Sequence, residues 1–348
     1  MTEYTKSLIN TLEKNRTLTE SEYLSLIDGY TPDAAKYAGE LALKAKKAFY
    51  GDAVFIRGLI EISNICKNDC KYCGIRKSNR NCDRYRLTRE DILSCCSHGY
   101  RLGFRTFVLQ GGEDGYYTDD VLCPLINEIK SRFPDCAVTL SLGERSKESY
   151  LALYEAGADR YLLRHETATK EHYELLHPTS LSFDERMRCL FDLKEIGYQV
   201  GCGFMVGSPG QESRHLARDL KFVEEFSPQM CGIGPFIPHK DTEYSSFTAG
   251  SVELTCYLLS LIRLIKPTIL LPATTALGTL RENGREMGIL AGANVVMPNL
   301  SPEEAKAKYT LYNNKLTSGA ESAEALETLK SRMKAIGAEI VCARGDAL

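Results

Sequence analysis

The most constraining feature of this chain is a regular alternation of short apolar segments with longer amphipathic ones, which begins at residue 53. Apolar segments of that length are typical of strands, and the amphipathic segments have the length of helices. The expected strands are 53–61, 105–110, 137–141, 159–164, 198–204, 230–236, 268–272 and 294–297. The expected helices between them are 88–102, 117–132, 146–156, 183–196, 211–226, 251–266 and 281–290. Strands that alternate with helices form parallel βα units.

Eight parallel strands can close into a ring without exposed edges, so the sequence predicts an α/β fold of the (β/α)8 TIM-barrel type. A chain of 348 residues with 43% hydrophobic residues suffices for one such barrel with extensions. We expect a helical extension at 1–50, the barrel at 51–300 and a C-terminal extension at 301–348 that closes the barrel. This last part is expected to form helices at 303–312 and 321–336.

Charge and hydropathy exclude several classes of partner. The net charge is −3, which gives no electrostatic case for nucleic acid or an anionic membrane. No apolar segment approaches the roughly 20 residues that span a bilayer. The N-terminal segment is polar and lacks the apolar core of a signal peptide. We therefore expect a cytoplasmic protein that binds neither nucleic acid nor a membrane.

The chain has 13 cysteines, and most of them stand singly in apolar segments. A secreted disulfide scaffold would be shorter and denser in cysteine, so most of these thiols are expected to be reduced and buried. Three cysteines differ, because Cys66, Cys70 and Cys73 follow the first strand with the spacing C-x3-C-x2-C. Three thiolates can bind three corners of an iron–sulfur cube and leave the fourth iron open.

Two other interpretations of these cysteines are a zinc knuckle and three unrelated thiols. Structural zinc sites use four ligands, usually in paired C-x2-C groups, and no second such pair occurs. The nearest histidine in the sequence, His98, lies far along the next expected helix. The iron–sulfur interpretation is therefore favoured.

The C-x3-C-aromatic-C loop, with Tyr72 before its last cysteine, resembles that of the radical S-adenosylmethionine (SAM) superfamily. The resemblance implies that the three cysteines hold a [4Fe–4S] cluster whose open iron is chelated by SAM. One electron from the cluster would then break a C–S bond of SAM and yield a 5′-deoxyadenosyl radical. Tyr72 would pack near the adenine.

Further SAM-binding residues follow from the same resemblance. After the second strand, Gly112 allows close approach of the backbone and Glu113 can accept hydrogen bonds from an ammonium group, as in the motif that holds the SAM amino group. Glu166 would bind a ribose hydroxyl. Arg186 could bind the SAM carboxylate, although an exposed helical arginine is an equally good interpretation. The glycine-rich segment 201–211 resembles the element that supports the adenine.

Two arginines mark the fourth strand. Strand alternation places Arg160 and Arg164 on one face, and two guanidinium groups inside a barrel are costly unless they meet anions. They could bind an anionic ligand or pair with inward carboxylates. His165 and His239 follow strand ends near the expected cavity mouth, where structural and catalytic roles are both open.

Four further segments narrow the resemblance to the HydE family, the maturases of the [FeFe]-hydrogenase active-site cluster. They are 141–144, 163–168, 232–239 and 272–278. This resemblance implies an internal cavity with Ser141 near SAM and with an anion-binding region lined by the following residues: Arg160, Arg164, Thr274 and Thr275. Tyr309 or Tyr312 could close the cavity, or belong to the core or a cap.

The HydE resemblance also implies a substrate and partners. The substrate would be a cysteine-bound Fe(CO)2(CN) unit, and the partners would be the sister maturase HydG and the scaffold HydF. Some HydE relatives carry a second cluster near the C-terminus, but this chain has only Cys342 there, so none is expected. Alternatives are methylornithine synthase, biotin synthase, and a non-catalytic iron–sulfur scaffold or redox sensor.

Overall fold

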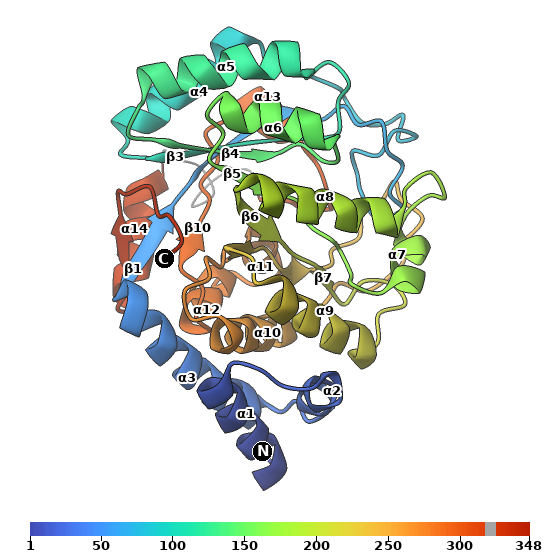
Figure 1. Cartoon of the computed structure of the whole chain (residues 1–348), viewed down its shortest axis with the longest axis vertical. Coiled ribbons are helices and arrows are strands. Elements are labelled where there is room, and N and C mark those ends of the chain that lie inside the picture. The colour runs from blue at the N-terminus through green and yellow to red at the C-terminus, as the bar shows by residue number, and fades with distance from the viewer. Residues whose placement is uncertain (317–324) are drawn as a thin grey trace.

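The computed structural model describes residues 1–316 and 325–348. Three helices begin the chain: α1 (Glu3–Asn15), α2 (Glu20–Asp28) and α3 (Pro32–Tyr50). Each starts after a threonine whose side chain accepts a backbone N–H of the first turn, and Pro32 occupies the first turn of α3. These helices pack along α9 (Ser213–Phe226) and α10 (Val252–Ile265) on one side of the barrel (Figure 1).

The strands form a closed parallel barrel. Their bounds are β1 (Ala53–Ile56), β2 (Gly58–Ser63), β3 (Thr106–Gly111), β4 (Ala137–Ser141), β5 (Arg160–Leu162), β6 (Gln199–Cys202), β8 (Met230–Cys231) and β10 (Val295–Val296). From β2 to β8 each strand pairs in parallel with the next, and β10 pairs with β1. Isolated bridges at Leu270, Pro272 and Asn299 complete the ring, so the predicted TIM-type barrel is confirmed.

Helices surround the barrel as the alternation predicted. They are α4 (Arg89–Arg101), α5 (Asp119–Arg132), α6 (Lys147–Glu155), α8 (Phe183–Ile196), α9, α10 and α12 (Gly284–Leu290). Two short helices, α7 (Lys170–Leu176) and α11 (Thr275–Leu280), were not predicted. Each has too few residues to show the repeating apolar pattern by which a helix is recognised in a sequence. The expected strand 268–272 is reduced to two isolated bridges.

Both ends of the barrel carry additional segments. Above β6 and β8, strands β7 (Met205–Val206) and β9 (Gly234–Pro235) pair with each other. Helix α13 (Glu303–Lys308) is shorter than the expected helix 303–312. Of the expected helix 321–336, residues 321–324 lie outside the described residues, and α14 (Leu326–Ala335) covers most of the rest.

The chain ends beside its own first strand. Strand β11 (Glu339–Val341) pairs in parallel with β1, and α14 lies next to them (Figure 1). The tail then crosses the barrel end where strands begin, since Thr106, the first residue of β3, donates a hydrogen bond to the carbonyl of Arg344. None of the helices in the described ranges combines the length and the apolarity needed to cross a membrane.

Candidate active site

A cavity of about 390 Å³ lies inside the barrel and reaches the loops after its strands. Active sites of such barrels lie at the carboxyl ends of the strands, where side chains from different loops meet. Cys66, Cys70 and Cys73 all line this cavity. The loop that carries them is fixed from two sides: Lys67 N–H donates to the Glu113 carbonyl at 2.9 Å, and Gly74 N–H donates to the Leu311 carbonyl at 2.8 Å.

The cysteine side chains suit a metal cluster in their chemistry and surroundings. Burial raises the pKa of Cys73 to about 12 and raises that of Cys70 as well, and the neighbouring thiols contribute to both shifts. Three thiolates this close to one another need a cationic partner to remain ionised. In the described part of the chain, no group of three His, Cys, Asp or Glu side chains has an arrangement that could hold a single metal ion. An iron–sulfur cube needs no such arrangement, because each of its cysteines binds a different iron.

The Gly112–Glu113 turn lies directly against the cysteine loop. A Cβ atom at Gly112 would overlap the carbonyl of Ile65 and lie 2.8 Å from the Cβ of Cys66, so only glycine fits. Glu113 faces the cavity and lies 3.2 Å from Lys67 Nζ. The oxygen that faces Lys67 is Oε2, which is buried and makes no hydrogen bond, so it keeps the capacity to accept one from a ligand.

Glu113 is flanked by the ends of two neighbouring strands. Ser141 ends β4 and lines the cavity. Gly143 follows with a φ of +78°, and a Cβ there would overlap the Glu113 side chain. This glycine therefore leaves the space that the Glu113 carboxylate occupies.

Tyr72 is partly buried, lines the cavity and is held in place by a histidine. The His177 Nδ1 lies 2.8 Å from the Tyr173 carbonyl, which can only accept, so Nδ1 carries the proton. Burial lowers the pKa of His177 to about 3, and its neutral Nε2 accepts a hydrogen bond from the Tyr72 hydroxyl at 3.2 Å. Tyr72 is thus held rigidly, with its ring edge-on to the imidazole.

Glu166, Arg164 and Arg186 also line the cavity. Arg186 is buried, and its guanidinium binds Glu144 at 2.5 Å and the Arg164 carbonyl at 2.6 Å. The exposed-arginine interpretation of Arg186 is therefore wrong. The Nη2 of Arg164 lies 3.0 Å from Glu166 Oε2, but neither atom makes a hydrogen bond of acceptable geometry. Both groups retain bonding capacity toward the cavity.

Threonine hydroxyls line the deeper cavity. Thr274 and Thr275 stand at the start of α11 and both face it. The Thr274 Oγ1 is buried without a hydrogen-bond partner, and the same is true of Thr139, which sequence reasoning missed. Thr139 lies two residues before Ser141 on β4, so strand alternation could have identified it.

Arg160 requires a correction, because it does not line the cavity. It is the first residue of β5, at the end of the barrel opposite the cysteines, and its guanidinium lies 2.5 Å from the Asp346 carboxylate of the C-terminal tail. The Arg160 guanidinium also donates hydrogen bonds to the Thr106 hydroxyl and to the Arg344 carbonyl. The alternative in which Arg160 pairs with a carboxylate is the one that the structure supports. The arginine that lines the cavity from this end is Arg57.

The segment after the last barrel strand covers the cavity. Tyr309 and Tyr312 both line it, together with Lys315. The side chain of Lys315 is only 7% exposed, and its ammonium group lies 2.5 Å from the fully buried carboxylate of Glu61 on β2. The same ammonium group donates a hydrogen bond to the Tyr309 carbonyl. Sequence reasoning missed this ion pair, which fastens the covering segment to the first half of the barrel.

Comparisons with known proteins agree with this geometry. Residues 60–223 match the Radical SAM superfamily. The [FeFe] hydrogenase maturase subunit HydE of Thermotoga maritima is 44% identical over 89% of this chain and 88% of its own. The 3-methylornithine synthase of Methanosarcina acetivorans is 30% identical over 77% of each chain.

Solved structures share the fold. Methylornithine synthase (PylB) superposes with a TM-score of 0.81 at 24% identity, covering 96% of this chain and 97% of its own. HydG, a maturase of the [FeFe]-hydrogenase, has a TM-score of 0.78 at 22% identity and covers 95% of this chain and 75% of its own. The cysteine loop, the cavity and the extent of the identity to HydE lead to one assignment: this chain belongs to the radical SAM superfamily and, within it, to the HydE family.

Proposed function

We propose that this chain is a radical SAM enzyme that acts in maturation of the [FeFe]-hydrogenase active-site cluster, with the barrel cavity as its active site. The single observation that carries the proposal is the cavity itself. It joins three cysteines at one end to unpaired hydrogen-bonding groups deeper in the barrel. The family assignment rests on 44% identity to HydE against 30% to a methylornithine synthase.

Cys66, Cys70 and Cys73 would hold the [4Fe–4S] cluster, with SAM beside it. When bound, the cluster and SAM supply a 5′-deoxyadenosyl radical. The residues of the chain bind and orient SAM: Glu113 lies against the cysteine loop, and its Oε2, which makes no hydrogen bond in the protein, would accept one from the SAM ammonium group. Gly112 leaves room for this approach.

The remaining SAM contacts come from other residues that line the cavity. Tyr72 presents a fixed aromatic ring for the adenine, and the Oε2 of Glu166, which makes no hydrogen bond in the protein, would accept one from a ribose hydroxyl. Ser141 lines the cavity at the end of β4. Arg186 carries a positive charge beside the cavity, which attracts the SAM carboxylate even while one side of the guanidinium binds Glu144.

Arg164, Thr274 and Thr275 would bind the substrate. Arg164 Nε and Thr274 Oγ1 are buried donors without protein partners, and such donors in a closed cavity favour a small anionic or cyanide-bearing ligand. We propose a cysteine-bound Fe(CO)2(CN) unit as that ligand. The covering segment with Tyr309, Tyr312 and Lys315 would keep water out while radicals are present.

Maturases of this kind act with other maturation proteins. We propose transient contacts with the HydF scaffold, which would receive the product, and with HydG, which would supply the substrate. The chemistry of oxygen-sensitive clusters is consistent with a cytoplasmic location. The hydrophobic composition and the net charge of −3 give no reason to invoke a membrane or nucleic acid.

The test is a SAM-cleavage assay on anaerobically reconstituted, reduced protein. We expect the cysteine-bound iron complex to accelerate formation of 5′-deoxyadenosine, whereas lysine and dethiobiotin should leave it at its basal rate. Acceleration by lysine would instead identify a methylornithine synthase. A protein that assembles the cluster but leaves SAM intact under reduction would be a scaffold or redox sensor, and the enzyme proposal would be wrong.

A further inference from the structure

A buried aspartate on the outer layer of the barrel is connected to the turn that carries Glu166. Asp219 lies on α9 and is completely buried, outside the set of residues that line the cavity. Its Oδ1 accepts a hydrogen bond from Ala168 N–H at 2.5 Å and lies 3.3 Å from His165 Nε2. Its Oδ2 is buried without a partner, which is a costly arrangement for a carboxylate.

The histidine has a defined tautomer. Gly203 N–H donates to His165 Nδ1 at 3.3 Å, so the proton of the neutral ring is on Nε2 and points to Asp219. Burial lowers the pKa of His165 to about 3, which keeps the ring neutral. His165 therefore links the end of β6 to α9 through hydrogen bonds and carries no charge.

The turn between His165 and Ala168 contains a backbone conformation that needs support. Glu166 has a φ of +65°, which costs a non-glycine residue about 1–2 kcal/mol. Among the described residues it is the only such non-glycine residue that lines the cavity. Its N–H donates to the Gly203 carbonyl at 3.0 Å. Asp219 then fixes the turn on the C-terminal side, at Ala168.

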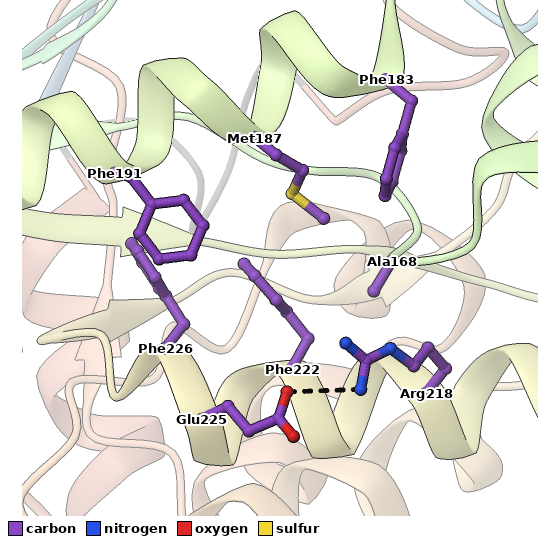
Figure 2. A pocket seen from close by; sticks show the side chains of 8 residues that line it. All are labelled: Ala168, Phe183, Met187, Phe191, Arg218, Phe222, Glu225 and Phe226. Carbon is purple, nitrogen blue, oxygen red and sulfur yellow. Dashed lines mark hydrogen bonds and ion pairs between the residues drawn. The ribbon is translucent and has the colours of Figure 1, made fainter.

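Packing alone does not hold this turn from outside. Ala168 borders a groove of about 440 Å³ between α8 and α9, whose walls include Met187 and Phe222 (Figure 2). Phe222 contacts the His165 ring, with ring centroids 4.7 Å apart. Because space remains on the outer side of Ala168, the hydrogen bonds that Asp219 accepts from Ala168 and His165 supply the constraint that side-chain packing would otherwise give.

We infer that Asp219 is a positioning residue for SAM binding: through His165 and the Ala168 N–H it holds Glu166 in the left-handed conformation that directs its carboxylate into the cavity. The inference rests on the proposed function, in which Glu166 binds the SAM ribose. Asp219 itself touches neither SAM nor the cluster. Its effect must therefore pass through Glu166, and this dependence can be measured.

The test is a double-mutant cycle on the anaerobically reconstituted holoprotein, with SAM affinity measured from the change in the cluster's electron paramagnetic resonance signal. Asp219→Leu removes both hydrogen bonds, and Glu166→Gln removes the carboxylate. We expect each single variant to weaken SAM binding about tenfold with normal iron content. The double variant should bind SAM as Glu166→Gln does, because a residue that acts through Glu166 has no effect without it.

Two variants separate positioning from stability. Asp219→Asn keeps an oxygen that can accept both hydrogen bonds, so it should restore SAM affinity to within about twofold of the wild type. Glu224→Gln is the control, since Glu224 lies on the same helix but binds Tyr23 and Thr17 of the N-terminal region. It should lower the melting temperature without changing SAM affinity.

Additive losses in the double variant would overturn the inference, as would unchanged SAM affinity in Asp219→Leu. If Asp219→Leu does not assemble the cluster, His165→Phe in the same cycle decides the question, because it removes only the imidazole link. Unchanged affinity in Glu166→Gln would refute both the ribose contact and this inference, while normal SAM cleavage in that variant would leave the enzyme assignment intact. Failure of the wild type to cleave SAM would instead refute the proposed function.

Discussion

Replacing Gly143 with alanine should separate SAM binding from cluster assembly. Gly143 has a φ of +78°, and a Cβ there would overlap the side chain of Glu113, the proposed acceptor for the SAM ammonium group. The obstruction falls on a side chain that can rotate. We therefore expect Glu113 to turn away and the cysteine loop to stay in place.

The size of the effect follows from two contributions. An alanine at this φ costs about 1–2 kcal/mol, which lowers stability. Loss of a hydrogen bond between a carboxylate and an ammonium group costs about 1.5–3 kcal/mol. Because each 1.4 kcal/mol corresponds to a factor of ten, SAM should bind roughly 10- to 150-fold more weakly.

Two other glycines in the same region provide matched comparisons. At Gly112 a Cβ would overlap the Ile65 carbonyl, so Gly112→Ala should displace the cysteine loop and reduce iron content. At Gly115 a Cβ would meet nothing within 4 Å, so Gly115→Ala should match the wild type in iron content and in SAM affinity. The measurements are iron and sulfide per chain, and SAM affinity of the reconstituted protein.

The outcome that contradicts this reasoning is specific. If Gly143→Ala loses iron to the same extent as Gly112→Ala, the Glu113 side chain does not absorb the overlap. If it binds SAM with wild-type affinity, Glu113 is not the ammonium acceptor.

The remaining predictions concern the cluster, the substrate, the covering segment and pH. Cys70→Ala should abolish SAM cleavage, because two thiolates do not retain the cube; iron analysis and product assay check this. Arg164→Ala should impair turnover of the iron complex more than cluster assembly, and equal loss of iron would count against a cavity role. Lys315→Met should destabilise the fold by about 3–5 kcal/mol by leaving Glu61 unpaired, and adding Glu61→Gln should recover much of this in thermal unfolding. Burial lowers the pKa of His165, His172 and His177 to about 3, 4 and 3, so the unfolded chain binds more protons. The stability of the apoprotein should therefore fall as pH decreases below about 6.5, by up to 1.4 kcal/mol per pH unit for each histidine.

The barrel could be predicted because its signal is periodic. Each expected βα unit has a counterpart in the structure, except that 268–272 forms only isolated bridges. Its sequence, Thr-Ile-Leu-Leu-Pro, is apolar enough for a strand, but Pro272 has no N–H to continue the hydrogen-bond ladder. Short helices such as α7 were missed because seven residues show less than two full turns.

The site could be predicted where its residues are close in sequence. The cysteine spacing and the Gly112–Glu113 pair are local patterns, and the structure brings them together through backbone hydrogen bonds. The Glu61–Lys315 pair, whose members are 254 residues apart, has no local signature. The hydrogen bond between Asp219 and Ala168 has no local signature either, because it depends on how α9 lies against the turn after β5.

Arg160 and Arg164 show why strand alternation alone cannot assign function. Both were placed on the inner face of one strand, yet four residues of extended chain span about 13 Å, so the two guanidinium groups belong to opposite ends of the barrel. The C-terminal tail supplies Asp346 at the first end, and that charge satisfies Arg160. At the other end Arg164 lies 3.0 Å from Glu166 of its own turn and keeps buried nitrogen atoms without hydrogen bonds. Arginine thus closes the barrel at one end and remains available to a ligand at the other. The difference is made by the C-terminal tail, since Asp346 lies 186 residues after Arg160 in the sequence.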